Sequence, residues 1–191
     1  LITCHIGNGA SISAIKGGKA IDTSMGLTPL EGLMMGTRTG SIDPAIVTFL
    51  MEHENIEPND MSDLLNKKSG LLGVTGKTND LRSVHDLVAE GDERAKLALE
   101  MYSYIIKKFI GQYIVALGTV DAIVMTAGVG ENDDKIRAAV FENLDHQGMI
   151  LDEAKNAATH GDLAEISTAD SPVKILVVPT NEELAIAQDV Y

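Results

Sequence analysis

The chain of 191 residues carries 15 Lys and Arg against 28 Asp and Glu, a formal net charge of −13 at pH 7. Such an acidic chain is a poor binder of nucleic acid or of an anionic membrane surface, because both are negatively charged. Its 45% apolar and 23% charged residues are typical of a globular protein and exclude wholesale disorder. No run approaches the roughly 20 apolar residues that a membrane-spanning helix needs.

Cysteine usage points to a reducing compartment. Cys4 is the only cysteine, so the chain forms neither an intrachain disulfide nor a Cys-x-x-Cys site. This favours the cytoplasm as the location of the protein. The sequence begins at Leu1, without an initiator Met and already inside a predicted strand. We therefore expect a fragment of a longer protein.

The first 24 residues predict a β-meander. Strands are expected at 1–6, 10–15 and 19–24, because each is rich in alternating apolar residues and they are joined by tight glycine turns. The following stretch, 25–40, holds four glycines and a proline and is too broken for regular structure. It is also too long for a plain connector, and long loops of this kind commonly bind a ligand.

Helices are predicted in the middle of the chain. Asp43 is expected to cap the first one, with Pro44 in its first turn and an apolar stripe made by Ile46, Val47, Phe49 and Leu50. A second short helix is expected at 59–67, followed by a glycine loop at 69–76. The next helix is expected to run from a cap at Thr78 or Asn79 to Ala89.

The longest periodic segment, 93–117, predicts a long core helix. Apolar side chains recur in it at spacings of three and four residues. They are Leu97, Met101, Tyr104, Ile105, Phe109 and Ile114. Core packing is the first explanation of this stripe, and a dimer face is the alternative.

The last third of the chain predicts alternating strands and helices. The continuous apolar run at 121–126 indicates a strand that is buried on both faces. Glycines at 128–130 are expected to turn the chain into a helix at 132–144, and a last helix is expected at 182–190. Further strands are expected at 164–167 and 173–178. The whole predicts one α/β domain.

The first hairpin turn, Gly7-Asn8-Gly9, is a candidate phosphate site. Its plain explanation is a tight turn, since Asn-Gly tolerates a positive φ. The functional alternative is that its backbone N–H groups, with the His5 imidazole and the hydroxyl of Ser11 or Ser13, hold phosphate oxygens.

Arg38 is a second candidate, placed between glycines shortly before a predicted helix. An arginine can form bidentate hydrogen bonds to a phosphate and stabilise charge on a phosphoryl group in transfer. A solvated loop arginine that pairs with Asp43 is the alternative, and spacing does not separate the two.

Three further segments join predicted strands or loops to helices. The segment 126–132 follows a buried strand, the place where α/β sheets bind ligands beyond the carboxyl ends of strands. The segment 79–82 is equally explained as an ordinary helix cap. In 179–183, Glu182 and Glu183 either suit the positive end of a helix or supply one carboxylate to hydrated Mg²⁺.

Taken together, these segments resemble the C-terminal part of the acetate kinase family, in the family's order and across essentially the whole chain. The resemblance implies an α/β fold of the acetate and sugar kinase/actin-like type, a ribonuclease H-like domain with a mixed β-sheet flanked by helices. Residues 1–191 would be a single C-terminal nucleotide-binding domain, without the N-terminal domain. The segments that carry the resemblance are 5–11 (HIGNGAS), 25–32 (MGLTPLEG), 36–44 (GTRTGSIDP), 79–82 (NDLR), 126–132 (TAGVGEN) and 179–183 (PTNEE).

The resemblance also implies site residues. Arg38 corresponds to the family's catalytic arginine, and Glu182 to the residue that organises Mg²⁺ or Mn²⁺. The phosphate-binding loop would comprise His5, Ile6, Gly7, Asn8 and Gly9. Other nucleotide contacts would be Asp80, Leu81, Arg82, Gly128, Val129, Gly130, Glu131 and Asn132. The family's catalytic histidine, an acetate-side arginine, an aspartate and an asparagine near the metal lie in the portion that precedes this chain.

The implied activity is reversible phosphoryl transfer, in which ATP and acetate give ADP and acetyl phosphate. The family forms homodimers, so a second copy of the chain is an expected partner. Alternatives are a propionate or butyrate kinase, an isolated nucleotide-binding or dimerisation module without turnover, and an actin-like ATPase that works by conformational change. Acyl specificity is not encoded here, because the acyl pocket would lie largely outside this chain.

Overall fold

The computed structural model describes residues 1–190, apart from the side chains of residues 182, 183, 185 and 189. Six strands form one sheet in the order β3-β2-β1-β4-β6-β5. The strands are β1 (Ile2–Ile6), β2 (Ala10–Lys16), β3 (Lys19–Thr23), β4 (Ala122–Thr126), β5 (Ala164–Glu165) and β6 (Lys174–Val177). The helices are α1 (Ala45–Glu54), α2 (Pro58–Lys67), α3 (Gly70–Thr75), α4 (Leu81–Ala89), α5 (Glu93–Leu117), α6 (Ala127–Asn132), α7 (Asp134–Phe141), the 3₁₀ turn η1 (Asp145–Gln147), α8 (Glu153–Ala158) and α9 (Glu182–Val190).

The sheet is mixed, as predicted. β1, β2 and β3 pair antiparallel as a meander, whereas β4 pairs parallel to β1 on one side and to β6 on the other. Alternate residues of β1 and β2 are buried, because one face of this part of the sheet lies under α5. β3 is exposed along its whole length, as expected of an edge strand.

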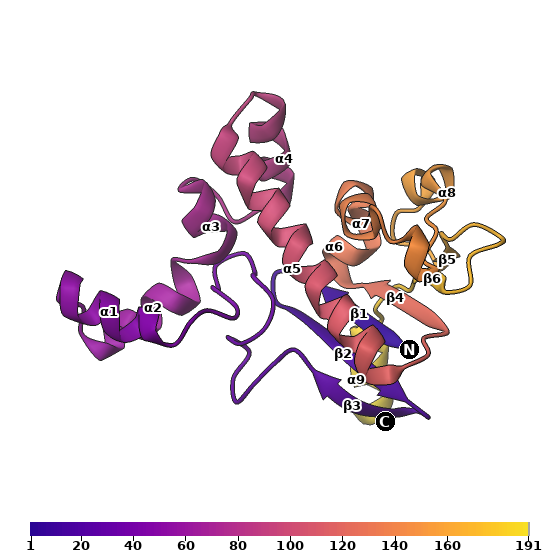
Figure 1. The fold of residues 1–191 in the computed structure, drawn as a ribbon, viewed down its shortest axis with the longest axis horizontal. Coiled ribbons are helices and arrows are strands. Elements are labelled where there is room, and N and C mark those ends of the chain that lie inside the picture. Colours follow the sequence, from indigo (N-terminus) through magenta and orange to yellow (C-terminus); the bar gives the residue numbers. More distant parts are fainter. Residues whose placement is uncertain (191) are drawn as a thin grey trace.

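The predicted long helix is confirmed as α5, which crosses one face of the sheet (Figure 1). Its buried face agrees only in part with the predicted one, because Ile105, Phe109 and Ile114 are half-buried against the core but the rest of the predicted stripe is exposed. Leu97, Met101 and Tyr104 are 49%, 41% and 64% exposed. The sheet, α3, α4 and α7 together cover α5, and its buried residues are Ala95, Ala98, Tyr102, Ser103, Ile106, Ile110, Tyr113 and Leu117. Both stripes have helical spacing, so the spacing alone does not tell which residues are fully buried.

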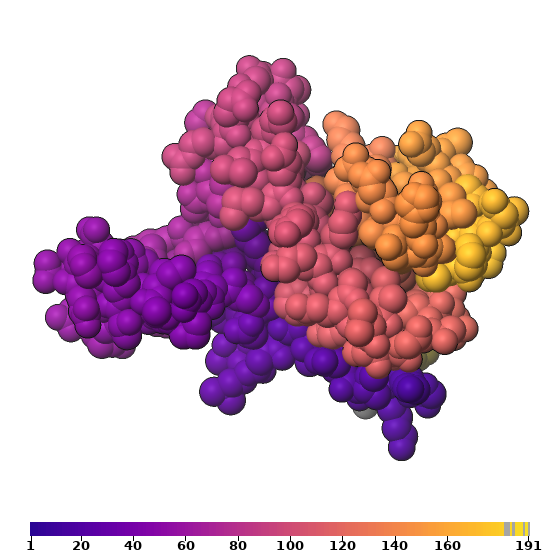
Figure 2. All heavy atoms as spheres, in the orientation of Figure 1, coloured from indigo at the N-terminus to yellow at the C-terminus, as the bar shows by residue number. Residues whose placement is uncertain are grey.

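The apolar stripe predicted for the first helix is likewise exposed. No residue of α1 is buried, and Ile46 and Phe49 are 42% and 55% exposed. α1 and α2 form an arm that projects from the body of the molecule (Figures 1 and 2). The Asp43 carboxylate accepts a hydrogen bond from the Ala45 N–H at 2.9 Å, in keeping with the predicted capping role.

Two predictions for the segment between 69 and 89 are wrong. The expected glycine loop at 69–76 is the short helix α3, which ends at Gly76 with a positive φ. The cap of α4 is Asp80 rather than Thr78 or Asn79, because its carboxylate accepts from the Arg82 N–H at 2.9 Å. Adjacent Thr, Asn and Asp residues are all good caps, and local preference does not choose among them.

In the last third, β4 is confirmed as a central strand with mostly buried residues. The predicted turn at 128–130 is wrong, because α6 begins directly at Ala127 and contains these glycines. The chain breaks instead at Asp133, which caps α7 by accepting from the Ile136 N–H at 2.9 Å. The sequence prediction also missed α8 and gave β5 two residues too many. α9 is confirmed, and no helix in the described part of the chain is long and apolar enough to cross a membrane.

Candidate functional site

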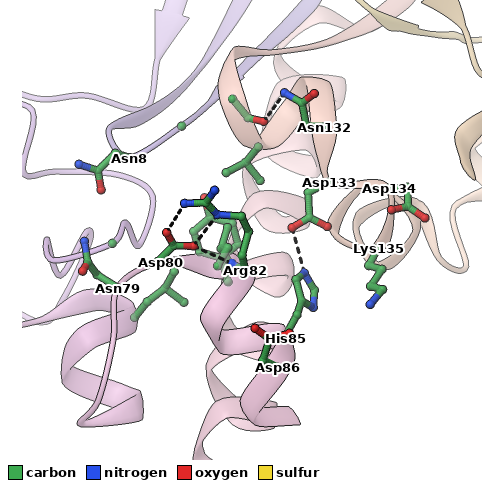
Figure 3. Close-up of a pocket in the computed structure, with 17 residues that line it drawn as sticks. Asn8, Asn79, Asp80, Arg82, His85, Asp86, Asn132, Asp133, Asp134 and Lys135 are labelled. Atoms are coloured by element: carbon green, nitrogen blue, oxygen red, sulfur yellow. Dashed lines mark hydrogen bonds and ion pairs between the residues drawn. The ribbon is translucent and has the colours of Figure 1, made fainter. Parts of the chain in front are cut away.

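A cleft of about 850 Å³ lies between α4 on one side and the start of α6 and α7 on the other. Figure 3 shows side chains from widely separated segments around it, with Asn8 and Asn79 at one end and Asp133, Asp134 and Lys135 at the other. The lining residues are Gly7, Asn8, Gly36, Leu71, Asn79, Asp80, Leu81, Arg82, His85, Asp86, Tyr102, Gly128, Val129, Asn132, Asp133, Asp134 and Lys135. The cleft therefore unites residues from four of the segments that the sequence singled out, 5–9, 36–44, 79–82 and 126–132.

The sheet explains why two glycine segments meet. β1 and β4 are parallel neighbours, so the loop after β1 and the helix after β4 emerge at the same edge. A Cβ added at Gly7 would lie 3.6 Å from the Ala127 Cβ and 4.0 Å from the Gly128 nitrogen. Ala127 has a φ of 64°, a conformation that costs a non-glycine residue of order 1 kcal/mol. Strain of this kind at the floor of a cleft is common at ligand sites.

Gly36 brings two amide side chains to one end of the cleft. A Cβ at this position would lie 2.8 Å from the Asn8 Oδ1 and 3.4 Å from the Asn79 Nδ2. A Cβ there would displace the end of the Asn8 side chain, so glycine at this position leaves room for both amides. Backbone N–H groups and amide N–H groups at such a turn are suited to bind an anion.

The loop that carries Arg38 is held by backbone hydrogen bonds. The N–H groups of Leu71 and Leu72 at the start of α3 donate to the Met35 and Gly36 carbonyls at 2.9 and 3.0 Å. The Ser69 N–H donates to the Thr37 carbonyl at 2.9 Å. The predicted ligand-binding loop is therefore fixed at its arginine, even though it contains no helix or strand.

Arg38 itself lies beside the cleft and not in its lining. Its Nη1 is 3.6 Å from the position of a Cβ at Gly9 and donates to the Pro29 carbonyl at 3.4 Å. Among the residues that the structure describes, no carboxylate forms an ion pair with Arg38. The alternative pairing with Asp43 is not formed.

Asp80 and Arg82 form a tight pair at the start of α4. Arg82 Nη2 and Nε donate to the two carboxylate oxygens of Asp80 at 2.6 and 3.1 Å. This guanidinium, together with the backbone N–H groups, lowers the pKa of Asp80 to about 2. The Arg82 side chain is 91% exposed and brings a positive charge to the cleft.

His85 and Asp133 join the two walls of the cleft. The His85 Nε2 lies 2.9 Å from the Asp133 Oδ2, and the side chains are only 17% and 15% exposed. Burial by itself would raise the pKa of Asp133, but hydrogen bonds from His85 and from the Ile136 N–H, with the nearby charges, hold it below its usual value. Tyr102 from α5 also lines the cleft. Its pKa is raised mainly by burial and to a smaller extent by the nearby charge of Asp133.

The sequence analysis missed several lining residues, and helix geometry is the signal that could have found some of them. His85 and Asp86 lie three and four positions after Arg82, on the same face of α4. The residues from Asp133 to Lys135 begin α7 and directly follow the segment 126–132. Tyr102 carries no local signal, because only the tertiary structure brings it to the cleft, whereas Gly36 belongs to the segment 36–44 that the sequence analysis singled out.

Five predicted nucleotide contacts do not line the cleft. Ile6 is fully buried in the core, Gly130 packs against the backbone of Met125, and His5 is half-buried in β1. Gly9 lies beside Arg38. The carboxylate of Glu131 accepts hydrogen bonds from the backbone N–H and hydroxyl of Thr180 at 2.8 and 3.0 Å. Glu131 thus fixes the segment that leads into α9.

The predicted metal ligand, Glu182, has a side chain outside the described part of the structure. Within the described residues, no group of three or more His, Cys, Asp or Glu side chains could hold a metal ion. Mg²⁺ commonly takes one or two protein carboxylates and fills its remaining positions with water and substrate phosphates. The donor set of the described residues therefore fits hydrated Mg²⁺ held mainly by a ligand better than a metal held only by protein.

Comparison with known proteins identifies the class. A structure of Porphyromonas gingivalis acetate kinase superposes with a TM-score of 0.96 at 52% identity, covering 98% of this chain and 47% of that one. A propionate kinase from Francisella tularensis superposes with a TM-score of 0.91 at 45% identity, covering 98% of this chain and 48% of that one. The fold is thus the actin-like, ribonuclease H-like one that the sequence predicts, with its cleft at the carboxyl ends of parallel strands.

The family follows from the sequence comparisons. The profile of the acetokinase family matches residues 1–188. The acetate kinase of Oleidesulfovibrio alaskensis is 58% identical over 188 residues, which are 98% of this chain and 46% of that protein. The chain belongs to the acetokinase family. It spans about half the length of the curated relatives that it matches.

Proposed function

We propose that this chain supplies the nucleotide-binding half of an acetate kinase, which transfers a phosphoryl group reversibly between ATP and acetate. The observation that carries the proposal is the cleft itself. It brings Gly7 and Asn8, the Asp80–Arg82 pair, and Gly128 of α6 to one place, although Gly7 and Gly128 lie 121 positions apart in the sequence. Membership of the acetokinase family supports the same reaction.

In the proposed reaction, an oxygen of the acetate carboxylate attacks the γ-phosphate of ATP in line. A carboxylate is already an ionised nucleophile, so catalysis depends on positioning and on charge stabilisation more than on a general base. The turn at Gly7 and Asn8 would hold the phosphates through backbone and amide N–H groups. Arg38, which lies beside this turn, would stabilise the negative charge on the transferred group.

A divalent cation, Mg²⁺ or Mn²⁺, is part of the proposal. It would neutralise phosphate charge when bound, and Glu182 would order its water ligands. The pair of hydrogen bonds between Glu131 and Thr180 supports this assignment, because they anchor the chain two residues before Glu182.

A homodimer in the cytoplasm is also proposed. The exposed apolar side chains on α5 support association, since a row of large apolar residues on a surface commonly marks a protein interface. The single, buried Cys4 suits a reducing compartment.

A propionate kinase is the second candidate, because a propionate kinase of solved structure has the same fold at 45% identity. The two activities differ in the acyl acceptor and share the phosphoryl chemistry. Turnover of the full-length enzyme with acetate, propionate and butyrate as competing acceptors separates them.

The first test is a calorimetric titration of the chain with ADP in the presence of Mg²⁺, followed by an assay for ATP formation from acetyl phosphate. We expect binding without turnover, because the family's remaining catalytic groups would lie in the preceding portion. Turnover by the chain alone would contradict the assignment of half a site. Absence of ADP binding would contradict the nucleotide-binding role.

A further inference from the structure

The two ends of the cleft differ in charge. At the end where Asn8, Gly36 and Asn79 meet, the lining offers amide and backbone groups. At the opposite end, the lining includes three carboxylates and one lysine (Figure 3). Those residues are Asp86, Asp133, Asp134 and Lys135. A polyphosphate would be repelled by the surplus of carboxylates, so the acidic end suits the uncharged nucleoside of ADP or ATP, whose hydroxyl and amino groups can donate hydrogen bonds to it.

His85 lies at the boundary between this acidic end and a second cavity. A second cavity of about 550 Å³ lies between α4, α5 and α7. His85 and Lys135 line both cavities, and Asp133 lines the first. His85 therefore separates the cleft from a second open space, and a smaller residue there would join the two.

The hydrogen bond from His85 to Asp133 fixes the His85 side chain at the boundary between the two cavities. The carboxylate of Asp133 is ionised and can only accept, so the His85 Nε2 carries the hydrogen and donates it at 2.9 Å. The other oxygen of Asp133 is already engaged as the cap of α7. The pair is poorly exposed, and a hydrogen bond to a charged group in such surroundings is among the stronger ones.

The pair also joins the two walls that carry expected nucleotide contacts. His85 lies one helical turn after Arg82 on α4, and Asp133 directly follows Asn132 at the end of α6. Loss of the hydrogen bond would free these walls to move relative to each other without altering the turn at Gly7 and Asn8.

We propose that His85, through its hydrogen bond to Asp133, is a positioning residue for the nucleoside end of the cleft, and that it sets affinity for the nucleoside but not for the phosphates. The inference rests on the proposed nucleotide-binding function. His85 touches no phosphate in this arrangement, and acts by holding the acidic wall in place.

The test compares two ligands on four forms of the chain by calorimetry: ADP, and tripolyphosphate, which lacks the nucleoside. His85→Leu keeps much of the volume but removes the donor, whereas His85→Gln retains an N–H group. His53→Leu is the matched control, because His53 is exposed on the projecting helix α1. We expect His85→Leu to weaken ADP binding about tenfold and His85→Gln to restore most of it. Tripolyphosphate binding should change by less than about twofold.

The outcomes separate the inference from the function on which it rests. If the unaltered chain binds ADP and His85→Leu binds it equally well, the positioning role is wrong. Equal losses for ADP and tripolyphosphate would show a merely structural role and also overturn it. Failure of the unaltered chain to bind either ligand would overturn the proposed function and the inference with it. If His85→Leu does not fold, His85→Ala, which also removes the donor and suits a helix, must show the same selective loss of ADP affinity.

Discussion

Arg137 is a fully buried arginine that forms no ion pair with a carboxylate of the residues that the structure describes. Its guanidinium donates five hydrogen bonds, to the carbonyls of Gly130, Glu131, Asn156 and Thr159 and to the Asn156 side chain. Two of these carbonyls belong to the end of α6 and two lie at the end of α8, so the cation sits at the negative ends of two short helices. Arg137 thereby holds α6 against α8, and α6 contributes Gly128, Val129 and Asn132 to the cleft lining.

Replacement of Arg137 is expected to destabilise the fold strongly. Arg137→Ala removes five hydrogen bonds and leaves the Gly130 and Thr159 carbonyls without this donor, while the Glu131 and Asn156 carbonyls keep the N–H groups of Gly161 and Thr159. The change should lower the free energy of unfolding by about 3 kcal/mol. Arg94→Ala is the matched control, because this arginine also caps a helix but is exposed, and it should cost about 1 kcal/mol. Urea denaturation measures both. Equal losses would contradict the central role of Arg137.

Gly36 leaves room for the side chains of Asn8 and Asn79 at the amide end of the cleft. A Cβ there would lie 2.8 Å from the Asn8 Oδ1, so Gly36→Ala should displace Asn8 and weaken ADP binding about tenfold or more. Gly111→Ala is the control, because nothing lies within 4 Å of its added Cβ. In the middle of α5 that change should instead stabilise the fold by about 1 kcal/mol. Calorimetric ADP titration and thermal unfolding of both variants check the pair, and unaltered ADP affinity in Gly36→Ala would refute the prediction.

Arg38 lies beside the phosphate end of the cleft without an ionic partner among the described residues. In the full-length enzyme, Arg38→Ala should lower kcat by at least about 100-fold, because the charge on the transferred phosphoryl group would lose its nearest cation. The affinity for ADP should change little, since Arg38 does not line the cleft. Steady-state kinetics with a separate ADP titration measures the two effects. Near-normal turnover would remove Arg38 from the mechanism.

At the scale of single elements, α4 begins with a charged cap whose strength depends on pH. The pKa of Asp80 is lowered from 3.8 to about 2 by Arg82 and by backbone N–H groups. A lowered carboxyl pKa means that the stabilisation is complete above about pH 4 and is lost as the pH falls toward 2. Arg82→Ala should move the pKa of Asp80 back toward its ordinary value. An NMR titration of the Asp80 carboxyl group measures this, and an unchanged midpoint would assign the shift to the backbone alone.

Sequence periodicity found most elements but not their buried faces. α5 carries two stripes of helical spacing, and the predicted one is exposed at Leu97, Met101 and Tyr104. The fully buried stripe includes smaller residues, Ala95, Ala98 and Ser103, which a search for large apolar side chains does not select. Likewise the stripe of α1 faces solvent, since α1 projects from the body of the molecule (Figure 2). Which stripe is buried depends on what another element covers, and a local pattern does not contain that information.

At the scale of the whole molecule, the exposed stripe of α5 is the best candidate for an interface. Met101 and Tyr104 also line a cavity of about 410 Å³ beside α3. If a second copy covers this surface, the double variant Met101→Glu with Tyr104→Glu should shift the protein from dimer to monomer, because buried charges would lack partners. Leu163→Glu is the control, since Leu163 is 75% exposed in a loop away from α5. Sedimentation velocity checks the prediction, and an unaltered dimer would place the interface elsewhere.

The cleft shows how the architecture assembles a site from distant segments. The parallel pairing of β1 with β4 brings the turn after one strand beside the helix after the other. α3 then fixes the loop that contains Gly36, and the pair of His85 and Asp133 joins α4 to α7. None of these contacts is local, and each lines or supports the same cleft.

The sequence by itself determined the α/β class, the N-terminal meander, the central strand β4, the long helix and most of the segments that form the cleft. These features depend on local patterns: alternation, helical spacing, and glycines where the chain must turn. The tertiary structure alone decided which residues of α5 are fully buried and that Tyr102 reaches the cleft. It also decided that Glu131 turns toward Thr180. The physical reason is that burial and contact depend on the partner that the fold brings near, and that partner is far away in the sequence.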